Sequence, residues 1–311
     1  MTVTGAPMWA VVPVAAVLLA VALIAAVLDA VFEGGRSTAL VGTGGWQRPF
    51  VESARLLRQR GRSTPAPDRL LWRAGTAGPV VVAALMVAVV PVGGVALADL
   101  SVGIVWFNAM DVVLWAVVWL SGWGPNSAYS LIGGYRFLAQ ALSYELPLMF
   151  ALTAPAVGAG SLRVGEAVES QQWLWFVVWM PVAFVVFLGS VAAFSAWGPF
   201  SAPVGRDAAG GVLVEAAGVD RLLLLAGRYA LLAAGSGMAV ALFLGGGAGP
   251  WLPDWAWTLV KTVAVLAALA AVRGRLPALH PERLTRIGWL VALPAVLLQL
   301  LLVSVVAVLK G

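Results

Sequence analysis

Four ionisable side chains interrupt otherwise apolar stretches of the sequence: Asp111, Glu145, Arg228 and Lys261. An ionisable group at the centre of a lipid bilayer costs about 3 kcal/mol or more, so such groups commonly serve a function. Carboxyl, amine and phenol groups whose pKa is shifted by burial exchange protons near neutral pH. The four residues therefore predict a proton path through a helix bundle, with simple pairing between neighbouring helices as the alternative. For Arg228 and Lys261, the long side chains could also reach the membrane surface.

Further polar side chains lie in the same stretch as Glu145. Arg136, Gln140 and Ser143 follow one another at helical spacing, so a helix presents all three on one face. Tyr144 adds a phenol directly beside Glu145. Because Glu145 points away from the face of Arg136, an ion pair between these two residues within one helix is not expected.

The elements that would hold these side chains are membrane helices. The 311 residues are 61% hydrophobic and 11% charged, with a mean hydropathy of +0.95, whereas a soluble domain is about 25% charged. This composition excludes soluble, disordered and fibrous classes and predicts an all-α integral membrane protein. The sequence has no cysteine and one histidine, His280. Disulfides, iron–sulfur clusters, thiolate zinc sites and multi-histidine metal or haem sites are therefore excluded within this chain.

A spanning helix needs about 20 mostly apolar residues, and eight such windows occur in the sequence. They predict a single polytopic domain over residues 1–311, with an amphipathic surface helix at about 49–58. The first window is too long for a removable signal peptide and lacks its basic start and cleavage site, so it is expected to be retained. The predicted spans are about 8–28, 78–98, 100–120, 137–157, 173–194, 222–244, 255–272 and 287–309.

The basic residues predict the orientation of these spans. Sixteen of the nineteen Lys and Arg residues follow odd-numbered spans, either in the connections or, for Arg228, near the start of the next span. The positive-inside rule places those connections, with the amphipathic helix, in the cytoplasm. Because eight spans leave both termini on one side, both termini are expected outside. The net charge of +5 is thus explained by topology, and no nucleic-acid partner is expected.

Residues 99–145 carry three motifs in a fixed order. Asp99–Ile104 reads DLSVGI, Gly122–Arg136 reads GWGPNSAYSLIGGYR, and Ala139–Glu145 reads AQALSYE. This combination resembles the H subunit of bacterial NADH-quinone oxidoreductase (respiratory complex I), and its spacing is specific. Shorter matches follow in order over nearly the whole chain: QRPFVE at 47–52, PF at 199–200, FLGG at 243–246, RGRLP at 273–277 and GW at 288–289.

Members of that family lie between the hydrophilic and membrane arms of the complex, form the membrane end of the quinone chamber and join it to a path of buried acids. The resemblance implies these roles here, in a multi-pass protein of the bacterial cytoplasmic membrane. Quinone is the expected substrate, and iron–sulfur clusters and any flavin belong to the other membrane and peripheral subunits. No catalytic residue or metal ligand is expected in the chain itself. The candidate residues are Arg136, Gln140, Tyr144, Glu52 and Arg55 for the quinone chamber, and Glu145, Glu215, Asp111 and Lys261 for the proton path.

The sequence departs from the family pattern where that pattern is rich in charge. The connection at 33–42 lacks the usual arginine motif. After the PF motif one acid remains, Asp207, beside a new base, Arg206, and Arg228 replaces a later acid. Asp111 stands where the family is usually apolar and would partly compensate. Such changes reshape the local field, because charges interact strongly in a low-dielectric interior, and the chain is interpreted as a divergent paralogue.

Four functions stay open. The leading interpretation is a membrane subunit of a proton-translocating quinone oxidoreductase that takes electrons from NADH or from another donor. A second is the membrane anchor of a related hydrogenase-type complex, although the Ser143-Tyr144-Glu145 segment favours the quinone version. A third is a degenerate paralogue with a structural role, which the lost acids favour. The fourth is a stand-alone ion or solute transporter, and the absence of an apparent inverted repeat argues against it.

Overall fold

The computed structural model describes residues 3–34, 45–205, 210–273, 275–277 and 279–310. Within these residues the chain forms a helix bundle, in which seven helices are long and apolar enough to cross a membrane. They are α1 (Val11–Gly34), α3 (Arg69–Val87), α4 (Gly103–Trp123), α5 (Ala128–Ala159), α9 (Gly218–Phe243), α10 (Asp254–Arg273), and the C-terminal run of α11 (Pro281–Ile287), η5 (Gly288–Ala292) and α12 (Leu293–Lys310). The predicted all-α membrane fold is confirmed.

The remaining elements are short. They are β1 (Thr4–Gly5), η1 (Met8–Ala10), η2 (Gly45–Gln47), α2 (Arg48–Arg58), β2 (Val95–Ala96), α6 (Val164–Glu169), α7 (Phe176–Trp179), α8 (Pro181–Phe194), η3 (Gly198–Phe200) and η4 (Ala202–Val204). β1 pairs in parallel with β2 through Thr4 opposite Val95. This pairing ties the start of the chain to the connection between α3 and α4.

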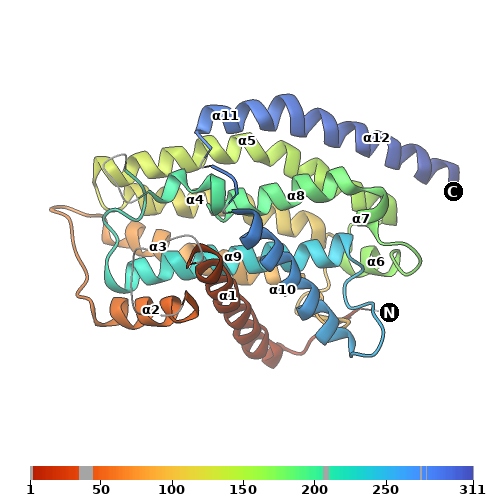
Figure 1. Ribbon diagram of the computed structural model, residues 1–311, viewed down its shortest axis with the longest axis horizontal. Coiled ribbons are helices and arrows are strands. Elements are labelled where there is room, and N and C mark those ends of the chain that lie inside the picture. Colours follow the sequence, from red (N-terminus) through yellow and green to blue (C-terminus); the bar gives the residue numbers. More distant parts are fainter. Residues whose placement is uncertain (1–2, 35–44, 206–209, 274, 278, 311) are drawn as a thin grey trace.

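α9 is the central helix of the bundle. Every residue from Leu231 to Phe243 is buried, and α9 packs against α1, α3, α8 and α10. A helix that is apolar on all sides must be covered on all sides, which explains its central place. In Figure 1, α3, α4, α5, α8 and α9 run roughly along the long axis, and α1 and α10 cross it obliquely.

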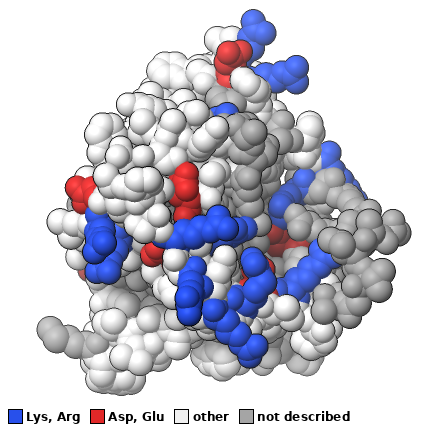
Figure 2. Space-filling view, turned by 90° about the vertical axis from the view of Figure 1, so that its left-hand side faces the viewer, with Lys and Arg blue, Asp and Glu red and all other residues white. Residues whose placement is uncertain are grey.

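The two ends of the bundle differ in charge. Both termini lie at one end (Figure 1). The opposite end, which faces the viewer in Figure 2, carries far more Lys and Arg than Asp and Glu. α2 packs on α1 and α9 with Leu56 fully buried, while Arg55 and Arg58 remain exposed. This helix matches the amphipathic surface helix predicted at 49–58, and the basic residues gather at one end of the bundle.

α3 and α5 both begin about nine residues before their hydropathy windows. α3 begins at Arg69, where the Asp68 side chain accepts hydrogen bonds from the Leu70 and Leu71 amides at 3.1 Å. It ends at Val87, before a turn in which Gly93 has a φ of 61°, so it lies about ten residues ahead of the 78–98 window. The window began too late because hydropathy does not detect a polar N-cap. It ended too late because the turn after α3 is itself apolar. α5, likewise, begins before its 137–157 window and runs for 32 residues.

The predicted span 173–194 is divided into α7 and α8. The division falls at Pro181, whose ring cannot donate a backbone hydrogen bond inside a helix. Gln299 of α12 supplies the missing partners. Its Oε1 accepts from the Val182 and Ala183 amides at 2.8 and 3.1 Å, and its Nε2 donates to the Trp179 carbonyl at 2.9 Å. The break is thus stable at membrane depth because these backbone groups find a side-chain partner.

Glycines bring α4 close to both of its neighbours. A Cβ atom on Gly75 of α3 would lie 2.2 Å from the Ser121 backbone nitrogen of α4. A Cβ atom on Gly122 of α4 would lie 2.9 Å from the Ser130 carbonyl oxygen of α5. These backbone contacts leave no space for larger residues, so they set how α4 is positioned between α3 and α5.

Candidate functional site

α4 and α5 bring two carboxyl groups together inside the bundle. Asp111 of α4 is 0% exposed and Glu145 of α5 is 9% exposed. The two carboxyl groups lie close enough to share a hydrogen bond, although they are far apart in the sequence. The packing of α4 against α5 therefore creates this pair, which no spacing along either helix predicts.

Each carboxyl group also has a polar neighbour from the opposite helix. The Tyr144 hydroxyl donates to Asp111 Oδ1 at 3.2 Å, and Asn108 Nδ2 donates to Glu145 Oε1 at 3.0 Å. Asn108 and Asp111 are nearly one turn apart on α4, so both face α5. We call Asn108, Asp111, Tyr144 and Glu145 the acid cluster.

The acid cluster has the chemistry of a proton-holding site. Two carboxylates in contact at this depth repel each other and have lost their hydration, and both effects disfavour charge on the pair. A proton shared between the two carboxyl groups would relieve this repulsion. The hydroxyl of Tyr144 extends the hydrogen-bonded chain beyond the pair.

Arg136 and Gln140 lie between the acid cluster and the basic end of the bundle, and both donate hydrogen bonds to backbone carbonyls. Arg136 Nη1 donates to the Gly210 carbonyl at 2.9 Å, and Gln140 Nε2 donates to the Ala193 carbonyl at 2.7 Å. The structure thus joins these two side chains to the end of α8 and to the segment before α9. Neither of these two hydrogen bonds reaches the acid cluster.

The other acidic candidates lie outside the apolar core. On α2, Arg55 donates to both carboxylate oxygens of Glu52 at 2.8 and 2.7 Å. This hydrogen-bonded carboxylate raises the pKa of Arg55, but an exposed ion pair stabilises a fold only slightly. Glu215 lies in the connection before α9, where Ser127 Oγ donates to it at 2.6 Å. Each of these acids therefore has a local partner near the basic end of the bundle.

Lys261 has different surroundings from the acids. Its ammonium group donates to the carbonyls of Leu244, Gly246 and Ala248 at 2.7, 2.9 and 2.8 Å. It also lies 4.3 Å from the ring centroid of Trp175, a favourable cation–π distance. All three ammonium protons are used to hold the connection between α9 and α10, at the opposite end of α9 from Glu215.

Comparison with known proteins identifies the family of the chain. The model of the family described as NADH dehydrogenase matches residues 6–304. The chain belongs to the NADH dehydrogenase family. It is 34% identical over 281 residues to the H 1 subunit of NADH-quinone oxidoreductase from Geobacter metallireducens, covering 87% of this chain and 85% of the relative. It is 35% identical over 273 residues to the H 2 subunit from Geobacter sulfurreducens, covering 84% and 83%, and 34% identical over 277 residues to the H 2 subunit from Rhodopseudomonas palustris, covering 87% and 86%.

The resemblance inferred from the AQALSYE motif is thus confirmed, and the acid cluster lies inside the matched region of this NADH dehydrogenase family member. Of the residues that depart from the family pattern, Arg228 donates to the carbonyls of Ser195 and Ala196 at 3.3 and 2.6 Å, just beyond the end of α8. Cationic groups are favourable at a helix C-terminus. Arg206, Asp207 and most of the connection at 33–42 lie outside the described residues.

A third buried carboxylate was missed by the sequence analysis of this family member. Asp29 of α1 is 4% exposed, and its Oδ2 accepts a hydrogen bond from the Tyr229 hydroxyl at 2.8 Å. Arg273 of α10 forms an ion pair with its Oδ1 and also lies over the Trp197 ring. The hydropathy window ended at residue 28, whereas α1 continues to Gly34. The sequence did carry a signal for this residue, because Asp29 is an acidic residue directly after the last residue of a predicted span.

Replacing Asp29 by Ala is expected to destabilise the folded chain by about 3 kcal/mol, since one half of a buried ion pair is removed. Thermal unfolding of the purified protein in detergent measures the loss. Asp99→Ala is the matched control, because Asp99 pairs with the partly exposed Arg163 at 2.7 Å and should cost about 1 kcal/mol or less. Equal losses in the two variants would contradict the assignment of Asp29 as a buried structural charge.

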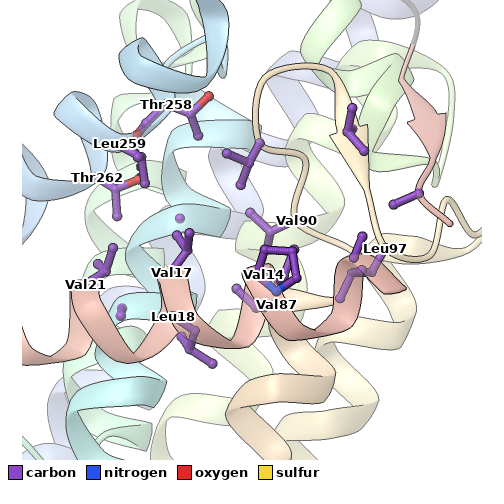
Figure 3. Close-up of a pocket in the computed structure, with 17 residues that line it drawn as sticks. Val14, Val17, Leu18, Val21, Val87, Val90, Leu97, Thr258, Leu259 and Thr262 are labelled. Carbon is purple, nitrogen blue, oxygen red and sulfur yellow. Dashed lines mark hydrogen bonds between the residues drawn. The ribbon is translucent and has the colours of Figure 1, made fainter. Parts of the chain in front are cut away.

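The cavity in Figure 3 is chemically unlike the acid cluster. It has a volume of about 220 Å³ and lies among α1, α3, α9 and α10, lined mainly by Val, Leu, Ala and Pro side chains. Its two threonine hydroxyls are already paired, because Thr258 donates to the Asp254 carbonyl and Thr262 to the Thr258 carbonyl. The cavity therefore offers apolar surface and no proton-exchanging group. Among the described residues, no three His, Asp or Glu side chains gather to hold a metal ion.

Proposed function

We propose that this chain is the membrane subunit of a proton-translocating quinone oxidoreductase of the complex I type, and that the acid cluster begins its proton path. The observation that carries the proposal is the contact between Asp111 and Glu145 in the buried interface of α4 and α5. The Geobacter and Rhodopseudomonas relatives support the assembly, because each is named as the H subunit of NADH-quinone oxidoreductase.

The quinone chamber is proposed at the basic end of the bundle. Arg136 and Gln140, with Tyr144 deeper in the same helix, would form its membrane wall, and Glu52 and Arg55 of α2 would lie near its mouth. The hydrogen bonds of Arg136 and Gln140 to backbone carbonyls support a positioning role, because they fix the end of α8 and the segment before α9. Glu215 would take up protons at this end before the acid cluster receives them.

Proton transfer along the path needs groups that gain and lose a proton with little change in free energy. A carboxyl pair that shares one proton can accept a second or release the first, and the Tyr144 hydroxyl offers a hydrogen-bonded route to Asp111. Lys261 fits this role less well, since its ammonium protons are all committed to backbone carbonyls. We therefore propose that Lys261 holds the connection between α9 and α10 and takes no part in proton transfer.

The partners follow from what the chain lacks. Without cysteine, it holds no iron–sulfur cluster, so these clusters and any flavin would belong to other membrane and peripheral subunits. We propose that the basic end in Figure 2 faces the cytoplasm and receives the peripheral subunits, with both termini on the outer side of the bacterial cytoplasmic membrane. The buried pairing of Asp111 favours this active role over a purely structural one, because an unneeded buried acid is costly.

Purification of the tagged chain from its native membrane tests the assembly. We expect iron–sulfur subunits to co-purify with it, and we expect deletion of the chain to abolish quinone reduction by that complex, with recovery on complementation. Recovery of the chain alone, together with unchanged quinone reduction in the deletion strain, would contradict the proposal and favour a stand-alone transporter.

A further inference from the structure

The GW motif at 288–289 takes no part in the proposed quinone chamber or proton path. It begins the π-turn η5 between α11 and α12, and this C-terminal run packs along α5 (Figure 1). A π-turn inside an α-helix is rare and occurs frequently at functional sites. The contacts of this turn on α5 therefore identify the residues that the motif serves.

Three contacts of the C-terminal run meet Leu142 and Ser143 of α5. A Cβ atom on Gly288 would overlap the Ser143 carbonyl oxygen, so the Gly288 backbone lies directly against that oxygen. The hydroxyl oxygens of Ser143 and Thr285 are 2.7 Å apart. Trp289 Nε1 donates to the Leu142 carbonyl at 3.3 Å. The C-terminal run thus holds both the backbone and the side chain of Ser143.

The hydrogen-bond ladder of α5 is interrupted at Ser143 by Pro147. A proline has no N–H, so Pro147 cannot donate to the Ser143 carbonyl four residues earlier. This turn is held less firmly by its own helix, and contacts from outside α5 matter more. The next two residues are Tyr144 and Glu145, and the Tyr144 hydroxyl donates to Asp111 at 3.2 Å. A shift of this turn would therefore move both side chains relative to their partners on α4.

We propose that Gly288 and Thr285 are positioning residues for the acid cluster, because through Ser143 they fix the turn of α5 that carries Tyr144 and Glu145. Gly288 acts by having no side chain, and Thr285 acts through the hydroxyl that meets Ser143. The importance of this positioning for proton transfer rests on the proposed proton path. A misplacement of about 1 Å in a reacting group can lower a rate about 100-fold, so a small change at this contact should impair proton transfer.

The first test measures the hydrogen bond of Tyr144 in the full chain, without quinone turnover. The chain has four tyrosines, so ¹³Cζ-tyrosine labelling in lipid nanodiscs resolves them by NMR, and Tyr144→Phe identifies the Tyr144 signal. We expect Gly288→Ala and Thr285→Val to shift this signal, because both disturb the turn that carries the phenol. Thr285→Val removes only a hydroxyl at similar size, so it tests the contact without the added bulk of Gly288→Ala.

Two control variants should leave the Tyr144 signal at its wild-type position. Thr285→Ser keeps the hydroxyl that meets Ser143. Gly189→Ala is the matched control for Gly288→Ala, because a Cβ atom on Gly189 of α8 would meet no atom within 4 Å.

The second test measures acidification of inside-out vesicles by the assembled complex. We expect acidification to fall about tenfold in Gly288→Ala and about fivefold in Thr285→Val, since both displace the reacting groups. Thr285→Ser and Gly189→Ala should acidify at the wild-type rate.

An unchanged Tyr144 signal in both Gly288→Ala and Thr285→Val would overturn the proposal. Wild-type acidification in both variants would also overturn it if Glu145→Gln abolishes acidification in the same complex. If the Tyr144 signal shifts as expected and Glu145→Gln leaves acidification unchanged, the positioning of Tyr144 stands and the proton path fails. The two proposals therefore fail separately.

Discussion

Glu145→Gln is expected to abolish proton translocation by the assembled complex without preventing assembly. Glutamine keeps the shape of the side chain. It also keeps an oxygen that can accept the Asn108 hydrogen bond, which is 3.0 Å long with the native Glu145. It cannot release or accept a proton, so the pair with Asp111 loses the exchange that the path needs. A positioned acid or base contributes about 10²- to 10⁴-fold to proton transfer, and we expect acidification to fall about 100-fold.

Acidification of inside-out membrane vesicles, measured beside the rate of quinone reduction, checks this result. The matched control is Glu166→Gln, because Glu166 lies at the surface on α6, 3.5 Å from Arg163, and its loss should change neither rate. Assembly is verified by co-purification of the other subunits. Wild-type rates of both quinone reduction and acidification in Glu145→Gln would remove Glu145 from the proton path.

Lys261→Met is expected to destabilise the protein strongly and to leave proton translocation per assembled complex unchanged. The substitution removes the donor for three carbonyl oxygens in the connection between α9 and α10. Backbone acceptors left unpaired in the interior cost about 1–3 kcal/mol each, and access to solvent and relaxation in this half-buried loop should bring the total to about 3 kcal/mol. The contact with the Trp175 ring is lost as well.

Thermal unfolding and acidification measured on the same preparation separate the two roles of Lys261. Thr262→Val is the matched control, because the neighbouring hydroxyl bonds only to the Thr258 carbonyl of its own helix at 2.7 Å and should cost about 1 kcal/mol or less. A Lys261→Met complex that assembles fully and no longer pumps would return Lys261 to the proton path.

The membrane class and most helices could be predicted from the sequence because lipid imposes a local rule. A spanning helix must be apolar over about 20 consecutive residues, so a window of hydropathy detects it wherever it packs. The rule failed where polar or turn chemistry decided the ends. Asp68 begins α3 earlier than hydropathy predicted, and Pro181 divides the predicted fifth span into two helices.

The candidate site was predicted only as separate residues. Asp111 and Glu145 were each recognised by their cost in an apolar stretch, and the AQALSYE motif added Tyr144. Their contact depends on how α4 is rotated and how closely it approaches α5, which glycine contacts such as that of Gly122 with Ser130 determine. No local pattern carries that information.

Lys261 and Asp29 illustrate the same limit in opposite ways. The sequence placed Lys261 among the candidates for the proton path because it interrupts an apolar stretch. In the structure, its ammonium group donates hydrogen bonds to three carbonyls of one loop. Asp29 fell just beyond a predicted span, but α1, α9 and α10 bury it between Tyr229 and Arg273. The sequence by itself determined that this chain is a membrane protein and which family it resembles. It also determined which ionisable groups interrupt the apolar stretches. Only the tertiary structure decided which of those groups meet, because partners from different helices are selected by packing and not by position along the chain.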